Sequence, residues 1–249
     1  MIGATSSGWE WAVLASAAVL LGMAKTGVPG LGVLAVPLVA WVMPARASTG
    51  LLLPMLILAD CFAVAYYRRH AEWPHVIRLL PWTLAGIGLG CLLLNRISDA
   101  QLRPLIGVIV LLMLGVHRWR QWRTGGVAPA PPAHWLFAAG MGLLAGATTM
   151  LANAAGPIMI LYLLSMRLPK IAFLGTSAWF FLIVNVAKVP FSAGLGLITW
   201  ESLGVNLVLA PVVMTGAVAG ILVARRLPEK GFAVAAQVLA ALAALKLFF

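Results

Sequence analysis

Ten apolar segments, separated by short polar or Gly/Pro-containing stretches, make up most of the chain. They cover residues 9–24, 31–43, 47–67, 76–95, 102–118, 135–150, 153–165, 171–193, 203–225 and 232–249. A helix needs roughly 20 apolar residues to cross a bilayer. The third, fourth, eighth and ninth segments reach this length, the last is near the lower limit, and the first, second, sixth and seventh are short. The pattern predicts an all-α, polytopic membrane protein.

The short segments meet in pairs at two interruptions of the apolar pattern. The first interruption, Lys25–Pro37, holds three glycines and two prolines, and the second, Gly146–Pro157, follows about 120 residues later. Hydrocarbon cannot satisfy broken backbone, so such breaks at membrane depth line protein-enclosed cavities. Paired breaks in two halves of a chain are a sequence indicator of a transporter binding site. We therefore expect the two tips, re-entrant or spanning, to form one site.

Glycine and proline positions recur in order between the two halves of the chain. The matches are Gly22, Leu31, Ala35 and Pro37 with Gly142, Leu151, Ala155 and Pro157 at an offset of 120; Pro44, Gly50 and Asp60 with Pro169, Gly175 and Asn185 at 125; and Pro81, Gly86, Gly90 and Arg96 with Pro211, Gly216, Gly220 and Arg226 at 130. We infer a first membrane repeat over residues 1–118, a basic Gly/Pro linker over 119–133, and a second membrane repeat over 134–249. Each repeat has about five helical segments, the first two short or broken.

Basic residues indicate how the repeats are oriented. With five segments per half, or three spans plus a re-entrant pair, one face carries eleven of them: Arg68, Arg69, Arg78, Arg118, Arg120, Arg123, Arg167, Lys170, Arg225, Arg226 and Lys230. The other face carries four: Arg46, Arg96, Arg103 and Lys246. If each short pair is instead one span, eight basic residues lie on one face and seven on the other. The positive-inside bias therefore favours the first arrangement. Its odd number of crossings inverts the second repeat, with both termini outside.

Composition narrows the class of protein further. The chain is 63% hydrophobic and 9% charged, whereas soluble domains carry roughly 25% charged residues. The net charge of +11 does not indicate nucleic-acid binding, because the basic residues cluster at segment ends. Isolated Cys and His residues give no metal-ligand spacing. We expect a multi-pass inner-membrane protein whose partners are the lipid bilayer and a small anion, with no metal or cofactor; a homodimer is the assembly considered.

The two tips carry groups that suit a small oxyanion. A helix N-terminus offers unpaired N–H groups and partial positive charge, and the second half-helices are expected to begin near Gly30–Gly32 and near Asn153. The predicted substrate-binding residues are Lys25, Thr26, Gly27, Gly30, Gly32, Thr148, Thr149, Asn153, Asn185 and Lys188. Two alternatives stay open. In the first, the glycines only allow close helix packing and bind no ligand. In the second, Lys25 extends to the outer interface instead of facing a site.

Asp60 is the single acid inside a confident span, and its repeat mate is Asn185. Lys188 follows Asn185 by three residues and shares its helix face. Asp60 is a candidate proton carrier and Lys188 a candidate anion attractor. The competing interpretation, which we favour for Asp60, is a static Asp60–Lys188 ion pair between the repeats. The hydroxyls of Thr176 and Ser177 either bond back to helix carbonyls or contribute to the site.

The glycine-rich break with the following Pro37, its recurrence at Gly146–Pro157 and the basic central linker resemble the sulfite exporter TauE/SafE family of membrane permeases. The resemblance covers essentially the whole chain, though its motifs are mostly Gly, Pro and small residues. It implies two repeats and transport of small sulfur-containing anions such as sulfite, thiosulfate or organosulfonates. The second break is poorer in glycine than the family pattern, carrying Thr148, Thr149 and Asn153, which puts the substrate in doubt.

Together these features predict a secondary transporter, most simply an exporter of a sulfur oxyanion or sulfonate by alternating access. An inside-negative potential drives an anion outward by about 2.3 kcal/mol per charge per 100 mV. An importer would need coupling to protons or sodium and is the first alternative. An intramembrane enzyme is disfavoured, because the deep polar residues are mainly Lys, Thr and Asn rather than an acid–base cluster. A channel is the third alternative.

Overall fold

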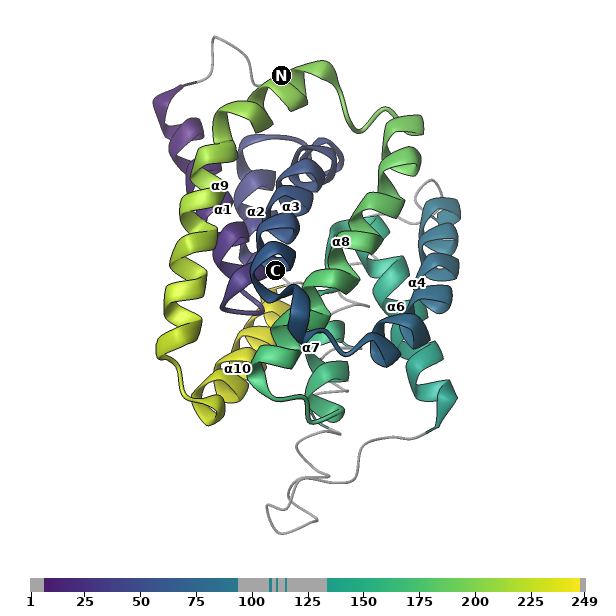
Figure 1. Ribbon diagram of the computed structural model, residues 1–249. Helices are drawn as coiled ribbons and strands as arrows, with labels where there is room; N and C mark the ends of the chain where they lie inside the picture. The colour runs from purple at the N-terminus through teal and green to yellow at the C-terminus, as the bar shows by residue number, and fades with distance from the viewer. Residues whose placement is uncertain (1–6, 94–107, 109–110, 112–114, 116–133, 247–249) are drawn as a thin grey trace.

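The computed structural model describes residues 7–93, 108, 111, 115 and 134–246, and every element in them is helical (Figure 1). The helices are α1 (Gly8–Thr26), α2 (Gly32–Val42), α3 (Ala45–Tyr67), a 3₁₀ turn (Arg68–His70), α4 (Trp73–Leu93), α6 (Trp135–Ala152), α7 (Gly156–Ser165), α8 (Lys170–Gly194), α9 (Trp200–Arg226) and α10 (Glu229–Lys246). Nine of the ten predicted segments thus form helices close to their predicted bounds. Most of the segment 102–118 and the whole linker 119–133 lie outside the described residues.

Among the described residues, five helical stretches are long and apolar enough to cross a membrane. They are Ala47–His70, Trp73–Leu93, Trp135–Ala152, Lys170–Gly194 and Trp200–Arg226. The four spans predicted from the sequence are among them. The prediction that the sixth segment is short was wrong, because the helix continues past residue 150 and reaches 18 residues. In contrast, α2 and α7 have 11 and 10 residues, roughly 16 Å of helix, so neither can span alone.

Each break is made by a few backbone conformations that ordinary residues avoid. In the first break, Gly30 has φ 101° and follows Pro29, which separates α1 from α2. In the second, Asn153 has φ 51° and ends α6 in the left-handed conformation that Asn tolerates. Pro157 then lies in the first turn of α7, where a missing N–H costs nothing. Asn153 therefore closes the helix before the break, and α7 begins three residues later than expected.

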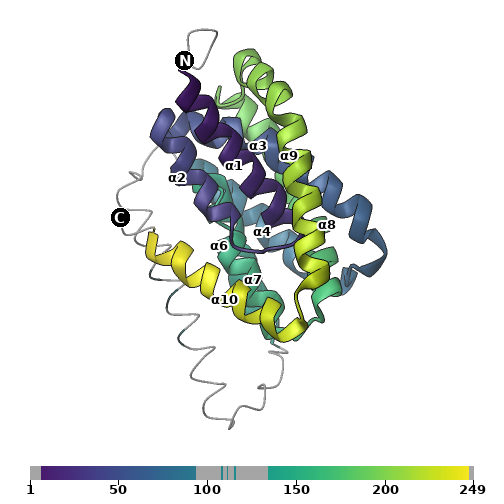
Figure 2. The ribbon, with the colours of Figure 1, turned by 90° about the vertical axis from the view of Figure 1, so that its left-hand side faces the viewer.

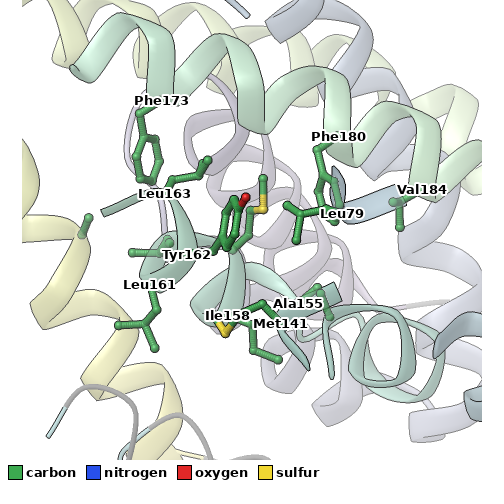
Figure 3. Close-up of a cluster of buried hydrophobic side chains, with 14 of the residues drawn as sticks. Leu79, Met141, Ala155, Ile158, Leu161, Tyr162, Leu163, Phe173, Phe180 and Val184 are labelled. Carbon is green, nitrogen blue, oxygen red and sulfur yellow. The ribbon is translucent and has the colours of Figure 1, made fainter. Parts of the chain in front are cut away.

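Helices from the two halves of the chain are interleaved. The closest pairings join α4 to α6 and α1 to α9, and α3 packs against α8. One apolar core combines α1, α2 and α3 with α9, and the other combines α4 with α6, α7, α8 and α10. In the second core (Figure 3), Tyr162 of α7 lies between Phe180 of α8 and Met141 of α6. Each core is thus built from both predicted repeats.

Glycine contacts at the two main pairings are related by two different sequence offsets. A methyl group on Gly22 would lie 2.3 Å from the Val213 carbonyl oxygen, where α1 meets α9. A methyl group on Gly146 would lie 2.0 Å from the Thr83 carbonyl oxygen, where α6 meets α4. Val213 and Thr83 match at the predicted offset of 130. Gly22 and Gly146, however, are separated by 124 residues rather than 120.

The same offset of 124 relates Gly32 and Gly156, the first residues of α2 and α7. The predicted match of Gly22 with Gly142 stays a prediction, and Gly146, whose contacts resemble those of Gly22, lies one helical turn further along α6. Gly142 and Gly146 share one face of α6, since residues four apart lie above one another in a helix. The sequence alone therefore does not show which of these two glycines corresponds to Gly22.

The broken pairs enter the molecule from opposite ends. In Figure 1, α1 begins near the top and α6 begins at the lower right, and Figure 2 shows the same separation from the side. The hairpin of α1 and α2 and the hairpin of α6 and α7 therefore approach each other near the middle. This placement supports the predicted inverted repeat, which stays a proposal.

Candidate functional site

A cavity of about 60 Å³ lies between the two breaks. This volume holds roughly four water molecules or one small hydrated ion. Its lining comes from α1, α2, α3, α6, α7 and α8 and consists of Leu21, Ala24, Lys25, Pro29, Gly30, Gly32, Leu56, Thr149, Asn153, Gly156, Ile160, Ser177, Phe181 and Asn185. Six of the ten predicted substrate-binding residues are in this set: Lys25, Gly30, Gly32, Thr149, Asn153 and Asn185.

Lys25, at the end of α1, forms an ion pair with Asp60 of α3. Its Nζ lies 3.0 Å from Asp60 Oδ1 and donates a hydrogen bond of 3.3 Å to Oδ2. The Asp60 side chain is fully buried and that of Lys25 is 12% exposed. Asn185 of α8 donates from Nδ2 to Asp60 Oδ2 over 2.7 Å, and Lys25 Nζ sits 3.8 Å from the centre of the Phe181 ring. Lys25 therefore faces the interior, and its charge is neutralised there.

Lys188 of α8 is fixed to the second tip by neutral oxygens. Its Nζ donates to Thr149 Oγ1 over 3.2 Å and to Asn153 Oδ1 over 2.5 Å. Lys188 is 2% exposed, and within the described part of the chain no carboxylate lies within ion-pair distance of it. Burying a charge is costly unless a counter-charge or metal accompanies it. The second tip thus holds an ammonium without a protein counter-ion.

Two helix N-termini also face the cavity. Gly32 begins α2 and Gly156 begins α7, and both glycines line it. Neither helix has a side-chain hydrogen bond at its N-cap. Their free N–H groups and helix dipoles add partial positive charge from two directions. The arrangement favours a small anion in the cavity.

Three predicted residues have structural contacts instead. Thr26 is buried, and its hydroxyl contacts the carbonyls of Gly22 and Ala217. A methyl group on Gly27 would fall on the Gly220 backbone, so this glycine permits close packing of α1 against α9. The Thr148 hydroxyl bonds back to the Leu144 carbonyl within its own helix. None of the three lines the cavity.

The predicted Asp60–Lys188 ion pair was wrong in its partner. Asp60 is paired with Lys25. Lys188 lies one turn beyond Asn185 along α8 and contacts Thr149 and Asn153. The sequence could not show which lysine pairs with Asp60. Lys25 lies beside the Gly/Pro-rich break, and only the fold places its side chain in the interior. The interpretation that Lys25 extends to the interface is likewise excluded by its burial.

Eight of the fourteen lining residues lie outside the predicted set, among them Ser177 and Phe181. Both lie on α8, four residues apart and therefore on one face. Ser177 was weighed only as a hydroxyl near the site, and Phe181 carried no polar signal at all. The position of Asn185 on the same face, four residues further on, is the sequence signal that could have identified both.

The site offers charge and hydrogen-bond donors but little for covalent chemistry. Its titratable groups are two lysines and one paired aspartate. Among the described residues, His, Cys, Asp and Glu side chains form no group of three or more that could hold a metal ion. Such a set can bind and release an anion by electrostatics and hydrogen bonds alone.

The sequence model of one protein family, described as sulfite exporter TauE/SafE, matches residues 14–247. None of the curated proteins and none of the solved structures matches the chain. The family match spans both breaks and all the helices that surround the cavity. Its members are transporters of sulfur-containing anions, in agreement with the spanning helices. The chain is therefore a multi-pass membrane protein that belongs to the sulfite exporter TauE/SafE family of transporters.

Proposed function

We propose that this protein is a secondary transporter that exports a small sulfur-containing anion, such as sulfite or an organosulfonate, across the inner membrane. The observation that carries the proposal is Lys188, a buried ammonium with neutral partners beside a cavity lined by two helix N-termini. An anion supplies the missing counter-charge. Its binding relieves the cost of burying that ammonium, which gives the site its preference for anions.

Binding in this proposal uses groups from both tips. The anion enters between Gly32 and Gly156, the first residues of α2 and α7, which both line the cavity. Lys188 turns from Asn153 towards the anion and forms a charge-assisted hydrogen bond. The Thr149 hydroxyl accepts from Lys188 and keeps its own O–H as a donor. These groups come from four helices, so a bound anion links α2, α6, α7 and α8.

Alternating access follows from the opposed broken pairs. In this proposal each tip gates one side of the cavity, so movement of α1 with α2 opens one side and movement of α6 with α7 opens the other. With a negative interior, release is favoured to the outside by about 2.3 kcal/mol per charge per 100 mV. Export therefore needs no coupling ion.

The pairing of Asp60 supports a structural role over proton coupling. Lys25 and the Asn185 amide both contact its carboxylate. A proton carrier must lose such partners during each cycle. Coupled import, which would use Asp60 as the carrier, is the alternative.

Reconstitution into liposomes tests the proposal. Purified protein should mediate saturable sulfite or methanesulfonate flux that accelerates when a potassium gradient with valinomycin makes the starting compartment negative. Empty liposomes and the Gly140→Ala variant, whose added methyl group would meet open space, are controls expected to give no flux and full flux respectively. Flux that never saturates would indicate a channel. Absence of flux with every sulfur anion would refute the proposal, and flux requiring a proton gradient would favour the coupled importer.

A further inference from the structure

We propose that the site selects singly charged anions over doubly charged anions of the same shape. This inference rests on the proposed transport function and specifies the substrate class. It arises from the distribution of buried charge around the cavity and from the orientation of one amide.

The buried charges leave one unit of positive charge for a ligand. Lys25 and Asp60 are 3.0 Å apart, and the pair carries no net charge. Lys188 is the remaining cation, and Thr149 and Asn153 contribute no charge. A monoanion therefore makes the site neutral. A dianion leaves one negative charge buried without a partner, which proteins avoid.

The side of the cavity nearest Asp60 also repels a second negative charge. The Asp60 carboxylate only accepts hydrogen bonds, so the Asn185 amide must present Nδ2 to it, and Asn185 Oδ1 points elsewhere. That oxygen is buried with no hydrogen-bond partner. Asn185 thus uses one of its two Nδ2 hydrogens on Asp60. This contact holds the negative charge of Asp60 beside the cavity that Asn185 lines, where it opposes a second negative charge on a ligand.

The cavity holds only a few water molecules. Its volume of about 60 Å³ leaves space for roughly four water molecules when empty and fewer once an anion enters. The buried charges around the cavity therefore contribute much of the compensation for the charge of the anion. Charge matching then decides which anion is retained.

Methanesulfonate and sulfate provide a matched pair of tetrahedral sulfur anions, one singly and one doubly charged. Binding to purified protein is measured by isothermal titration calorimetry and by inhibition of flux in liposomes. We expect methanesulfonate to bind at least about tenfold more tightly than sulfate. Sulfite affinity should fall as rising pH converts hydrogen sulfite to the dianion, while methanesulfonate affinity stays constant over the same range.

The Asp60→Asn variant raises the net buried charge from one positive unit to two and keeps the shape of the side chain. It leaves two buried ammonium groups, so the preference for methanesulfonate over sulfate should narrow by at least about tenfold. The Gly88→Ala variant, whose added methyl group would meet nothing within 4 Å, should keep the wild-type preference. If Asp60→Asn folds and keeps the wild-type preference, the charge account is overturned.

The wild-type measurements decide the inference even where the variant fails to fold. Sulfate binding as tightly as methanesulfonate, or sulfite affinity rising with pH, would overturn charge selection and leave transport of sulfur anions intact. Binding of neither probe, together with absent sulfite flux, would refute the proposed function itself. The two failures are therefore distinguishable.

Discussion

The two broken tips use related backbone geometry but distribute charge in opposite ways. At the first tip, Lys25 belongs to the tip itself and is neutralised by Asp60 of α3. At the second, the lysine is Lys188 on the long helix α8, and the tip supplies only Thr149 and Asn153. If the halves are matched at an offset of 124 residues, Thr149 is the counterpart of Lys25. One half thus holds an ion pair and the other holds an unmatched ammonium.

This difference separates a structural contact from a binding group. An ion pair inside the protein fixes α1 to α3 and leaves no net charge to attract a ligand. An ammonium held by neutral oxygens can exchange those partners for an anion. Asn185 connects the two regions, because it lines the cavity and bonds to Asp60. Duplication can supply the geometry, and the function depends on where the two copies differ.

The largest expected effect comes from removing one partner of the ion pair. Asp60→Leu leaves the Lys25 ammonium buried without a counter-charge, and we expect a loss of about 3–5 kcal/mol in the free energy of unfolding. The double variant Lys25→Met/Asp60→Leu removes both charges and should recover most of that loss. Reversible denaturation in detergent, followed by tryptophan fluorescence, measures both values.

A double-mutant cycle makes this result interpretable. If Lys25→Met and Asp60→Leu act independently, their effects will add in the double variant, and the two residues are then not coupled. Additive losses would contradict the ion pair as the contact that stabilises the first tip. Recovery in the double variant, with sulfur-anion binding preserved, would identify the first tip as mainly structural.

Removing the lysine of the second tip should instead affect binding. Lys188→Met leaves no unmatched charge for an anion, so we expect a loss of about 2–5 kcal/mol in anion binding free energy. Stability should change little, because relief from burying a charge offsets two lost hydrogen bonds. Calorimetric titration with methanesulfonate measures the loss, and Lys230→Met, on an exposed lysine, is the matched control. Unaltered affinity in Lys188→Met would contradict the assignment of the binding charge.

The helical architecture and the position of the breaks could be predicted because both follow from local sequence. Apolar segment lengths set the helices, and the clustered Gly and Pro residues set the breaks near Gly30 and Pro157. The cavity brings together six of the ten predicted binding residues for the same reason. Residues at a break must lie near it in space, whatever the packing of the remaining helices.

Pairing between distant residues could not be predicted in this way. The choice of Lys25 rather than Lys188 as the partner of Asp60 depends on the depth and rotation of α1 and α8. Phe181 was missed because an apolar side chain in an apolar helix gives no signal of a cavity. The sequence does not decide whether Gly142 or Gly146 corresponds to Gly22, because both glycines lie at a close crossing of α6 with α4.

The smallest expected effect tests whether the two halves pack alike when their residues are matched at the offset of 124. Gly22→Ala and Gly146→Ala each push a methyl group into the backbone of the partner helix, at 2.3 Å and 2.0 Å from carbonyl oxygens. Both should cost about 1–3 kcal/mol, which lowers Tm by about 2–4 °C per kcal/mol. Gly142→Ala, whose nearest neighbour would be the Trp82 Cβ at 2.8 Å, should cost less.

Thermal unfolding in detergent compares the three variants, with Gly140→Ala as the control in open space on the same helix. A loss in Gly22→Ala that matches Gly146→Ala supports the offset of 124, because the two glycines then occupy equivalent crossings of α1 with α9 and α6 with α4. A loss that matches Gly142→Ala would restore the offset of 120. In that case Thr149 would no longer be the counterpart of Lys25, and the contrast between a neutralised and an unmatched tip would compare positions that are not equivalent.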